Sequence, residues 1–366
     1  MSGVNVFAFD DGYGDNKLYS GKEPLLISSH VTRYKKKMKN ESEESSKETK
    51  QQKLLNHLGV EIDDIPGEQF LVGEGALRED PSIRWSGGAD KHQDGNFPIL
   101  AKTCLAVMAG QQNNVEVNPL VMGLPVLDDE DPNRHENLER MLKGMHEVTL
   151  IEPDGTRVVK TIHVQSVVTK KQPFGTFADL LLGKNGEIRD KELANQFNVI
   201  VDIGTRTLNV LTLDSLEPVN GLSDTIYEGV SKAYDEVNGV IKEKFNAGVT
   251  SGKISQVCKD KEIKGYDLTE VVQHAYKRQA QVIANEINTM FIDSWAYVDN
   301  LIITGGGAEE DVMRPYLEGK FPVEPKFKGR FTTVQGFWKT GVRHAVKAGA
   351  EEINLPTGGK IKVKEE

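Results

Sequence analysis

The sequence is poor in cysteine, in aromatic residues and in long apolar runs. Its two cysteines, Cys104 and Cys258, exclude a disulfide framework and a cysteine-rich metal site. No stretch of about 18 apolar residues occurs and the N-terminus lacks the pattern of a secretory signal. Lys and Arg number 45 against 55 Asp and Glu, and the resulting charge of −10 disfavours direct contact with DNA. We therefore expect a cytoplasmic protein that binds neither membranes nor DNA directly.

The composition is that of a globular protein, and 366 residues are enough for two domains. One segment differs, because Lys35–Lys53 consists almost entirely of charged and polar residues and cannot cover a core. Elsewhere predicted strands alternate with predicted helices, which favours an α/β architecture with sheets covered on both faces. The strands are expected at Val4–Phe9, Phe70–Gly73, Asn118–Met122, Phe197–Val201, Leu208–Leu213 and Asn300–Thr304. The helices are expected at Ile99–Ala109, Arg134–Lys143, Ser223–Phe245, Asp267–Ser294 and Val342–Ala350.

Three of the predicted strands end in glycine turns. The turns read DDGYGDNK from Asp10, DIGTRT from Asp202 and TGGGA from Thr304. Without a side chain in the way, the backbone N–H groups of such turns can approach phosphate oxygens. Asp10 and Asp202 each open a turn at the end of a strand, and two such carboxylates could hold a hydrated Mg²⁺ through its waters.

The first two turns share one order of features and lie in opposite halves of the chain. Each has a strand, Asp-x-Gly, polar residues and a returning strand. This repetition indicates a duplicated domain whose halves close on a phosphate group from two sides. The Walker pattern GxxxxGK[ST] is absent, and no GxGxxG opens a helix after a strand. Both P-loop and dinucleotide-binding folds therefore lose support.

The three turns, in this order, resemble the two phosphate loops and the adenosine loop of the actin superfamily. The DDG opening, Gly123–Val126 and Gly336-Phe337 are most similar to bacterial ParM-type (StbA-type) actins, whose ATP-dependent filaments push plasmids apart. The resemblance implies an α/β fold in which a ribonuclease H-like unit is duplicated, with a nucleotide cleft between two domains. Domain I would span 1–175, with a subdomain inserted at about 29–96 and a C-terminal helix, about 336–366, packed back onto it. Domain II would span 176–335, with an insertion at about 222–297.

The same resemblance implies roles for individual residues. Gln172 would orient the attacking water, while Asp10 and Asp202 would act on that water and on the magnesium shell. Asn209 stands where many relatives carry a second acid. The residues expected to bind the nucleotide are Asp11, Gly12, Tyr13, Gly14, Asn16, Lys17, Gly204, Thr205, Arg206, Thr207, Lys242, Glu243, Gly305, Gly306 and Gly307.

As a member of this superfamily the protein would be an ATPase that polymerises with ATP or GTP and Mg²⁺, and slow hydrolysis would destabilise its filaments. A ParR-like adaptor on a plasmid centromere would link the filament to DNA, and Lys35–Lys53 is either a solvated loop or a contact with the next subunit. The alternative is a sugar- or acetate-type kinase of the same superfamily, which Trp85–Asp90 leaves open. A DnaK-type chaperone is disfavoured, because little chain follows the predicted nucleotide fold.

Overall fold

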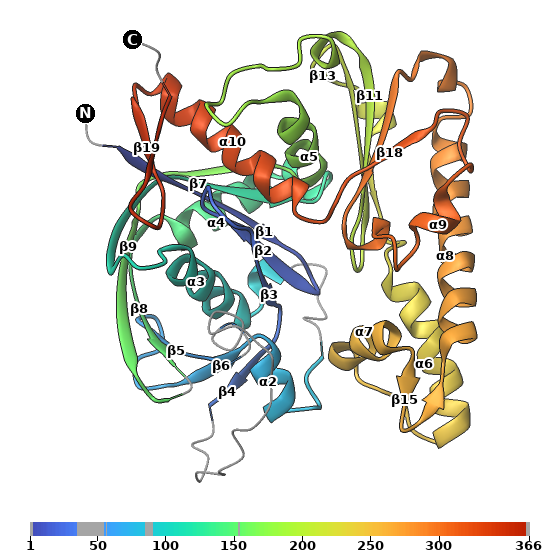
Figure 1. The fold of residues 1–366 in the computed structure, drawn as a ribbon, viewed down its shortest axis with the longest axis horizontal. Coiled ribbons are helices and arrows are strands. Elements are labelled where there is room, and N and C mark those ends of the chain that lie inside the picture. Colours follow the sequence, from blue (N-terminus) through green and yellow to red (C-terminus); the bar gives the residue numbers. More distant parts are fainter. Residues whose placement is uncertain (1–2, 35–54, 56, 85–90, 153, 364–366) are drawn as a thin grey trace.

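The computed structural model describes residues 3–34, 55, 57–84, 91–152 and 154–363. Two segments singled out in the sequence, Lys35–Lys53 and Trp85–Asp90, lie outside the described residues. Each half of the chain forms its own large sheet, and helices lie between and beside the two sheets (Figure 1). Within the described ranges, no helix has the length and apolar character needed to cross a membrane.

The first sheet contains twelve strands of the described residues. They are β1 (Val4–Asp11), β2 (Asp15–Tyr19), β3 (Leu25–Ser28), β4 (Val31–Arg33), β5 (Leu58–Ile62), β6 (Phe70–Val72), β7 (Asn114–Leu124), β8 (Gly144–Ile151), β9 (Arg157–Val164), β10 (Val167–Lys171), β19 (Glu352–Asn354) and β20 (Lys360–Lys362). At its centre β1 runs parallel to β7, and β2 returns antiparallel to β1. Strand β19 pairs with the start of β1 on the edge away from β7, the edge that β2 also uses, so the C-terminal residues complete the sheet that the N-terminal residues begin.

The second sheet comes from the C-terminal half and is smaller. Its strands are β11 (Phe197–Ile203), β12 (Leu208–Asp214), β13 (Glu217–Pro218), β14 (Asp224–Ile226), β17 (Asn300–Thr304) and β18 (Pro325–Phe327). As in the first sheet, a hairpin (β11 and β12) lies beside a parallel neighbour, β17. A separate two-stranded ribbon pairs β15 (Glu262–Ile263) with β16 (Tyr266–Asp267).

Helices cover both faces of these sheets. They are α2 (Glu74–Glu79), α3 (Asn96–Met108), α4 (Pro132–Leu142), α5 (Gln172–Leu181), α6 (Ser231–Phe245), α7 (Ser251–Asp260), α8 (Thr269–Met290), α9 (Arg314–Leu317) and α10 (Thr332–Lys347). Short 3₁₀ turns are η1 (Lys91–Gln93), η2 (Asp128–Glu130), η3 (Leu193–Asn195), η4 (Asn220–Leu222), η5 (Trp295–Tyr297) and η6 (Gly306–Ala308). Strands covered on both faces need apolar residues at every position, which explains why the central strands of the two sheets read as unbroken apolar runs.

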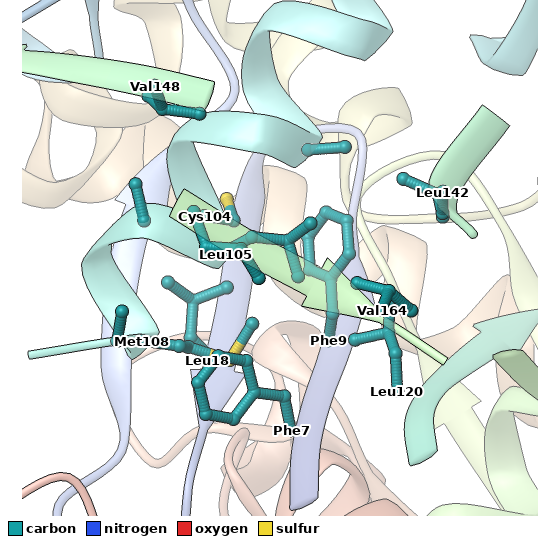
Figure 2. Packing of buried hydrophobic residues seen from close by; sticks show 14 of the residues in the cluster. Phe7, Phe9, Leu18, Cys104, Leu105, Met108, Leu120, Leu142, Val148 and Val164 are labelled. Atoms are coloured by element: carbon teal, nitrogen blue, oxygen red, sulfur yellow. The ribbon is translucent and has the colours of Figure 1, made fainter. Parts of the chain in front are cut away.

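Strand β1 shows this two-sided burial residue by residue. Phe7 and Phe9 point to the face covered by α3, where Cys104 and Leu105 meet them (Figure 2). The intervening residue Ala8 belongs instead to the cluster that α10 covers on the opposite face. Successive side chains of a strand alternate between its faces, so the apolar residues of β1 serve two cores at once.

Helices α5 and α10 join the two halves of the molecule. Phe177 of α5 packs against the second sheet, whereas Trp338 of α10 packs against the first. The two helices cross at a pair of glycines, and a Cβ built on Gly336 would lie 1.7 Å from the carbonyl oxygen of Gly175. No larger residue fits at this crossing. The boundary predicted after residue 175 falls inside α5, and the predicted domain limits stay predictions.

Two predicted helices differ from the structure. The first two turns of the helix expected from Ser223 are wrong, because Asp224–Ile226 forms β14 on the edge of β12 and α6 begins only at Ser231. Unpaired β12 backbone competes for this segment, and pairing with it outweighs the helical spacing of the apolar residues. The C-terminal helix expected over about 336–366 ends at Lys347, after which β19 and β20 pair with β1 and with each other.

The far ends of the two halves touch each other. Thr250 donates a hydrogen bond through its hydroxyl to the carbonyl of Pro81, at 3.0 Å. At the start of α7, a Cβ on Gly252 would come within 2.9 Å of Leu77 and of the ring nitrogen Nε2 of His30. The glycine therefore permits a close approach that bridges the two halves beside α2 and α7, which face each other in Figure 1.

Candidate nucleotide site

The two predicted phosphate loops are the turns of two matching hairpins. In the first, Asp10 pairs in register with Lys17, and in the second Asp202 pairs with Asn209. In both pairs the two residues lie seven positions apart in the sequence. Lys17 and Asn209 are therefore counterparts, and each stands opposite the aspartate that ends its own first strand.

Lys17 is the cation between the two aspartates. Its Nζ lies 2.7 Å from Oδ2 of Asp10, and its side chain is largely buried. Burial by itself would lower the pKa of Lys17, but the charges of Asp10 and Asp202 outweigh it and raise that pKa. Burial raises the pKa of Asp202, and the nearby Asp10 carboxylate raises it further against the opposing effect of Lys17. The three groups form a buried cluster with a surplus of negative charge.

Gln172, the first residue of α5, connects the two hairpins. Its Nε2 donates to Oδ1 of Asp10 at 3.2 Å, and its Oε1 accepts from Nδ2 of Asn209 at 3.1 Å. The Oδ1 atom of Asn209 in turn accepts from the hydroxyl of Thr225 at 2.8 Å and, more weakly, from the backbone N–H of Val126 at 3.4 Å. A carboxylate at one end and a backbone N–H at the other have fixed roles, so they determine the direction of both amides.

The turns themselves face each other closely. A Cβ on Gly14 would lie 2.8 Å from the hydroxyl oxygen of Thr205, so the first turn approaches the second with no room for a side chain. The guanidinium carbon of Arg206 lies 4.7 Å from the ring centroid of Tyr13, a cation–π contact between the halves. Burial raises the pKa of Tyr13 to about 12. The N–H of Ser231, at the start of α6, donates to the carbonyl of Thr205 at 2.8 Å and fixes the second turn.

The third glycine turn lies against the second hairpin. Gly305 has φ +93°, and a Cβ there would lie 2.3 Å from Oδ1 of Asp202. Glycine is required both by this backbone angle and by this approach. Beyond the turn, Glu309 accepts from the backbone N–H of Arg330 at 2.9 Å, and the Arg330 guanidinium lies 4.0 Å from Asp15 of the first hairpin.

These elements enclose a cleft of about 640 Å³ between the halves. Twelve of the predicted site residues line it: Asp10, Asp11, Gly12, Tyr13, Lys17, Gln172, Asp202, Gly204, Thr205, Thr207, Gly306 and Gly307. Among the other predicted residues, Gly14 packs against Thr205, Arg206 contacts the ring of Tyr13, and Gly305 packs against Asp202. The side chain of Asn16 is buried and donates to the hydroxyl of Ser29 at 3.0 Å. It holds the first hairpin in place.

The predicted nucleotide contacts at Lys242 and Glu243 are not placed in the cleft. Both side chains are exposed on α6, because their neighbour Ile241 is the residue of this turn that faces the core. Residues outside the prediction also line the cleft, among them Tyr234, Ser255, Gln256, Cys258, Lys259, Lys261, Tyr276, Glu309, Asp311 and Arg330.

Sequence reasoning also missed two residues of η1. Nζ of Lys91 lies 3.0 Å and Nε2 of His92 lies 2.7 Å from the same oxygen, Oδ2, of Asp11. About 80 residues separate them from Asp11, so no local pattern pointed to them. For Asn209 a signal was present, because aligning the two hairpins by their equal spacing would have matched it with Lys17.

Two models of known protein families match the chain. Residues 8–175 match the family model of the N-terminal domain of actin-like proteins, and residues 200–317 match the model of the C-terminal part of the archaeal actin homologue MreB-like. The chain is therefore an actin-like protein. No curated protein sequence matches it.

Solved structures of similar fold include several bacterial and archaeal actin homologues. Apo ParM of psk41 has a TM-score of 0.68 at 20% identity, covering 96% of this chain and 100% of that one. ParM in a 15-stranded filament from Clostridium botulinum has a TM-score of 0.73 at 17% identity, covering 93% and 99%. An archaeal actin homologue in complex with ADP has a TM-score of 0.67 at 20% identity, covering 94% and 100%. The predicted α/β, two-domain actin-like fold is confirmed.

Proposed function

We propose that this actin-like protein is an ATPase of the ParM type, which binds a nucleoside triphosphate between its halves and assembles into filaments. The observation that carries the proposal is the pair of matching hairpins, with Asp10 and Lys17 in one and Asp202 and Asn209 in the other, facing one cleft. A volume of about 640 Å³ is in the range of small-molecule sites. The structural relatives include an ADP complex and a filament, and we extend both properties to this chain as part of the proposal.

Hydrolysis would depend on positioning and charge. The neutral amide of Gln172 is too weak a base to take a proton, but it can orient water beside Asp10. Lys17 would neutralise charge on the phosphates from its place between the aspartates. In phosphoryl transfer these two effects supply most of the catalysis, so a slow ATPase needs no stronger base.

Asp10 and Asp202 fit a magnesium ion held through its waters. Within the described ranges, no three or more His, Cys, Asp or Glu residues gather as a metal cage. Mg²⁺ keeps several waters and accepts few protein ligands, and the surplus negative charge around Asp202 favours a cation. The ion would supply positive charge against the phosphate oxygens. We propose ATP as the nucleotide, with GTP as the alternative, which the assay below tests when it is repeated with GTP in place of ATP.

Filaments would arise when nucleotide holds the two halves in one arrangement and the head-to-tail contact between copies repeats without closing. Since the charge is −10, we propose that a basic, ParR-like adaptor bound to a plasmid centromere attaches the filament to DNA. Both cysteines are buried free thiols, which is compatible with the cytoplasmic location that we propose.

The test combines light scattering with release of inorganic phosphate and ADP. With ATP, we expect light scattering to rise above a threshold protein concentration and then to fall as phosphate is released. When ADP replaces ATP, we expect no rise in scattering. Asp202→Asn should abolish most phosphate release. No assembly and no nucleotide turnover at any concentration would contradict the proposal. ADP release that requires an added sugar or acetate, without scattering, would favour the kinase alternative.

A further inference from the structure

Lys91 brings a second lysine to the cleft from outside both hairpins. Its Nζ lies 3.0 Å from Oδ2 of Asp11 and 4.9 Å from the ring centroid of Tyr13, and its side chain is 12% exposed. It lines the same cleft as Lys17 and Gly12 of the first turn. The first phosphate loop therefore has a cation on each of its two consecutive aspartates.

Asp11 is bound twice through one oxygen. His92 reaches the Oδ2 atom that also binds Lys91, while Oδ1 is buried without a hydrogen-bond partner among the residues that the structure describes. Burial alone would raise the pKa of Asp11, but the charge of Lys91 and the hydrogen bonds from His92 and Lys91 outweigh it and lower that pKa. Because His92 lies 2.7 Å from Oδ2 of Asp11, the buried carboxylate keeps one hydrogen-bond partner when Lys91 leaves.

Lys17 has no such freedom. It lies 2.7 Å from Asp10 and is held electrostatically by Asp202 as well, so its departure would leave two buried aspartates facing each other. If Lys17 left, Asp10 would keep only the neutral amide of Gln172 and would face Asp202, whereas Asp11 would keep His92 if Lys91 left. Of the two lysines at this end of the cleft, Lys91 is therefore the one whose movement costs less.

We propose that Lys91 binds the terminal phosphate of a nucleoside triphosphate and distinguishes it from a diphosphate. The proposal rests on the nucleotide site proposed above. When the triphosphate enters beside Gly12, the Lys91 ammonium exchanges Asp11 for the phosphate oxygens, and His92 stays on Asp11. With a diphosphate, Lys91 returns to Asp11. Since α3 begins at Asn96, the movement transmits the nucleotide state to the part of the first half that α3 supports.

The test compares affinities for ATP and ADP, both with Mg²⁺, by isothermal titration of the full chain. Lys91→Gln should weaken ATP binding at least about tenfold, the loss expected for one charge-assisted hydrogen bond, and change ADP binding less than about twofold. Lys91→Arg keeps the charge and should retain most of the preference. Lys170→Gln is the matched control, because Lys170 contacts Phe174 and does not line the cleft. His92→Phe should also reduce the preference, since Asp11 would then retain Lys91.

Each outcome decides the matter. Equal losses of ATP and ADP affinity in Lys91→Gln, or an unchanged preference, would overturn the role of Lys91 while leaving the nucleotide site intact. Wild-type protein that binds neither nucleotide would overturn the proposed function and this inference together. A melting temperature within a few degrees of wild type identifies variants that remain folded, and Lys91→Arg gives a second measurement if Lys91→Gln does not.

Discussion

His30, buried where the two halves touch, should make the protein less stable in mild acid. Its side chain is 3% exposed, Nδ1 contacts the hydroxyl of Ser28, and Nε2 faces Gly252 with no hydrogen-bond partner in the described part of the chain. Burial lowers the pKa of His30 from 6.5 to about 4. As the pH falls from 6.5 to about 4, His30 is protonated in the unfolded chain but stays neutral in the folded chain. The free energy of unfolding therefore falls over this pH interval.

The expected size follows from the two pKa values. Between pH 7.5 and pH 5 the free energy of unfolding should fall by ~2 kcal/mol on account of His30 alone. Urea unfolding followed by circular dichroism at the two pH values measures this loss, and His30→Gln should remove most of it. Burial also lowers the pKa of His146, so His146→Gln should remove a separate part of the loss at a site away from the junction. An equal loss in wild type and His30→Gln would refute the reasoning.

Two further predictions concern packing and buried charge. Lys17→Met should lower the free energy of unfolding, measured with urea, by ~3 kcal/mol, because it removes the cation beside buried carboxylates. Adding Asp10→Asn should recover much of that loss. Single-variant stability equal to wild type would contradict the buried cluster. Gly336→Ala should cost ~2 kcal/mol or more, because its Cβ would collide with the carbonyl of Gly175, whereas Gly239→Ala in α6 has open space and should gain up to ~1 kcal/mol by thermal unfolding. Similar effects of the two alanines would show that the helix crossing is looser than described.

Local chemistry made much of the fold and the site predictable. The strand predicted over Asn300–Thr304 matches β17 residue for residue, and the turns after Asp10 and Asp202 lie where expected. A strand buried on both faces consists of consecutive apolar residues, and a tight turn needs glycine. Both features can therefore be recognised from residues that are neighbours in the sequence. The helix expected from Ser223 is wrong over its first residues, because they pair with the edge of β12. The sequence around Ser223 gives no sign of this pairing.

By itself, the sequence determined the two hairpins, with their aspartates, their glycines and their equal spacing. Only the tertiary structure decided what stands beside them. It brought Lys91 and His92 to Asp11 across about 80 residues, joined Gln172 to Asn209, and left Lys242 exposed on α6 and outside the lining of the cleft. The physical reason is one of range. Turn and strand preferences act between neighbours in the chain, whereas the partner of a buried charge is chosen by the packing of whole elements.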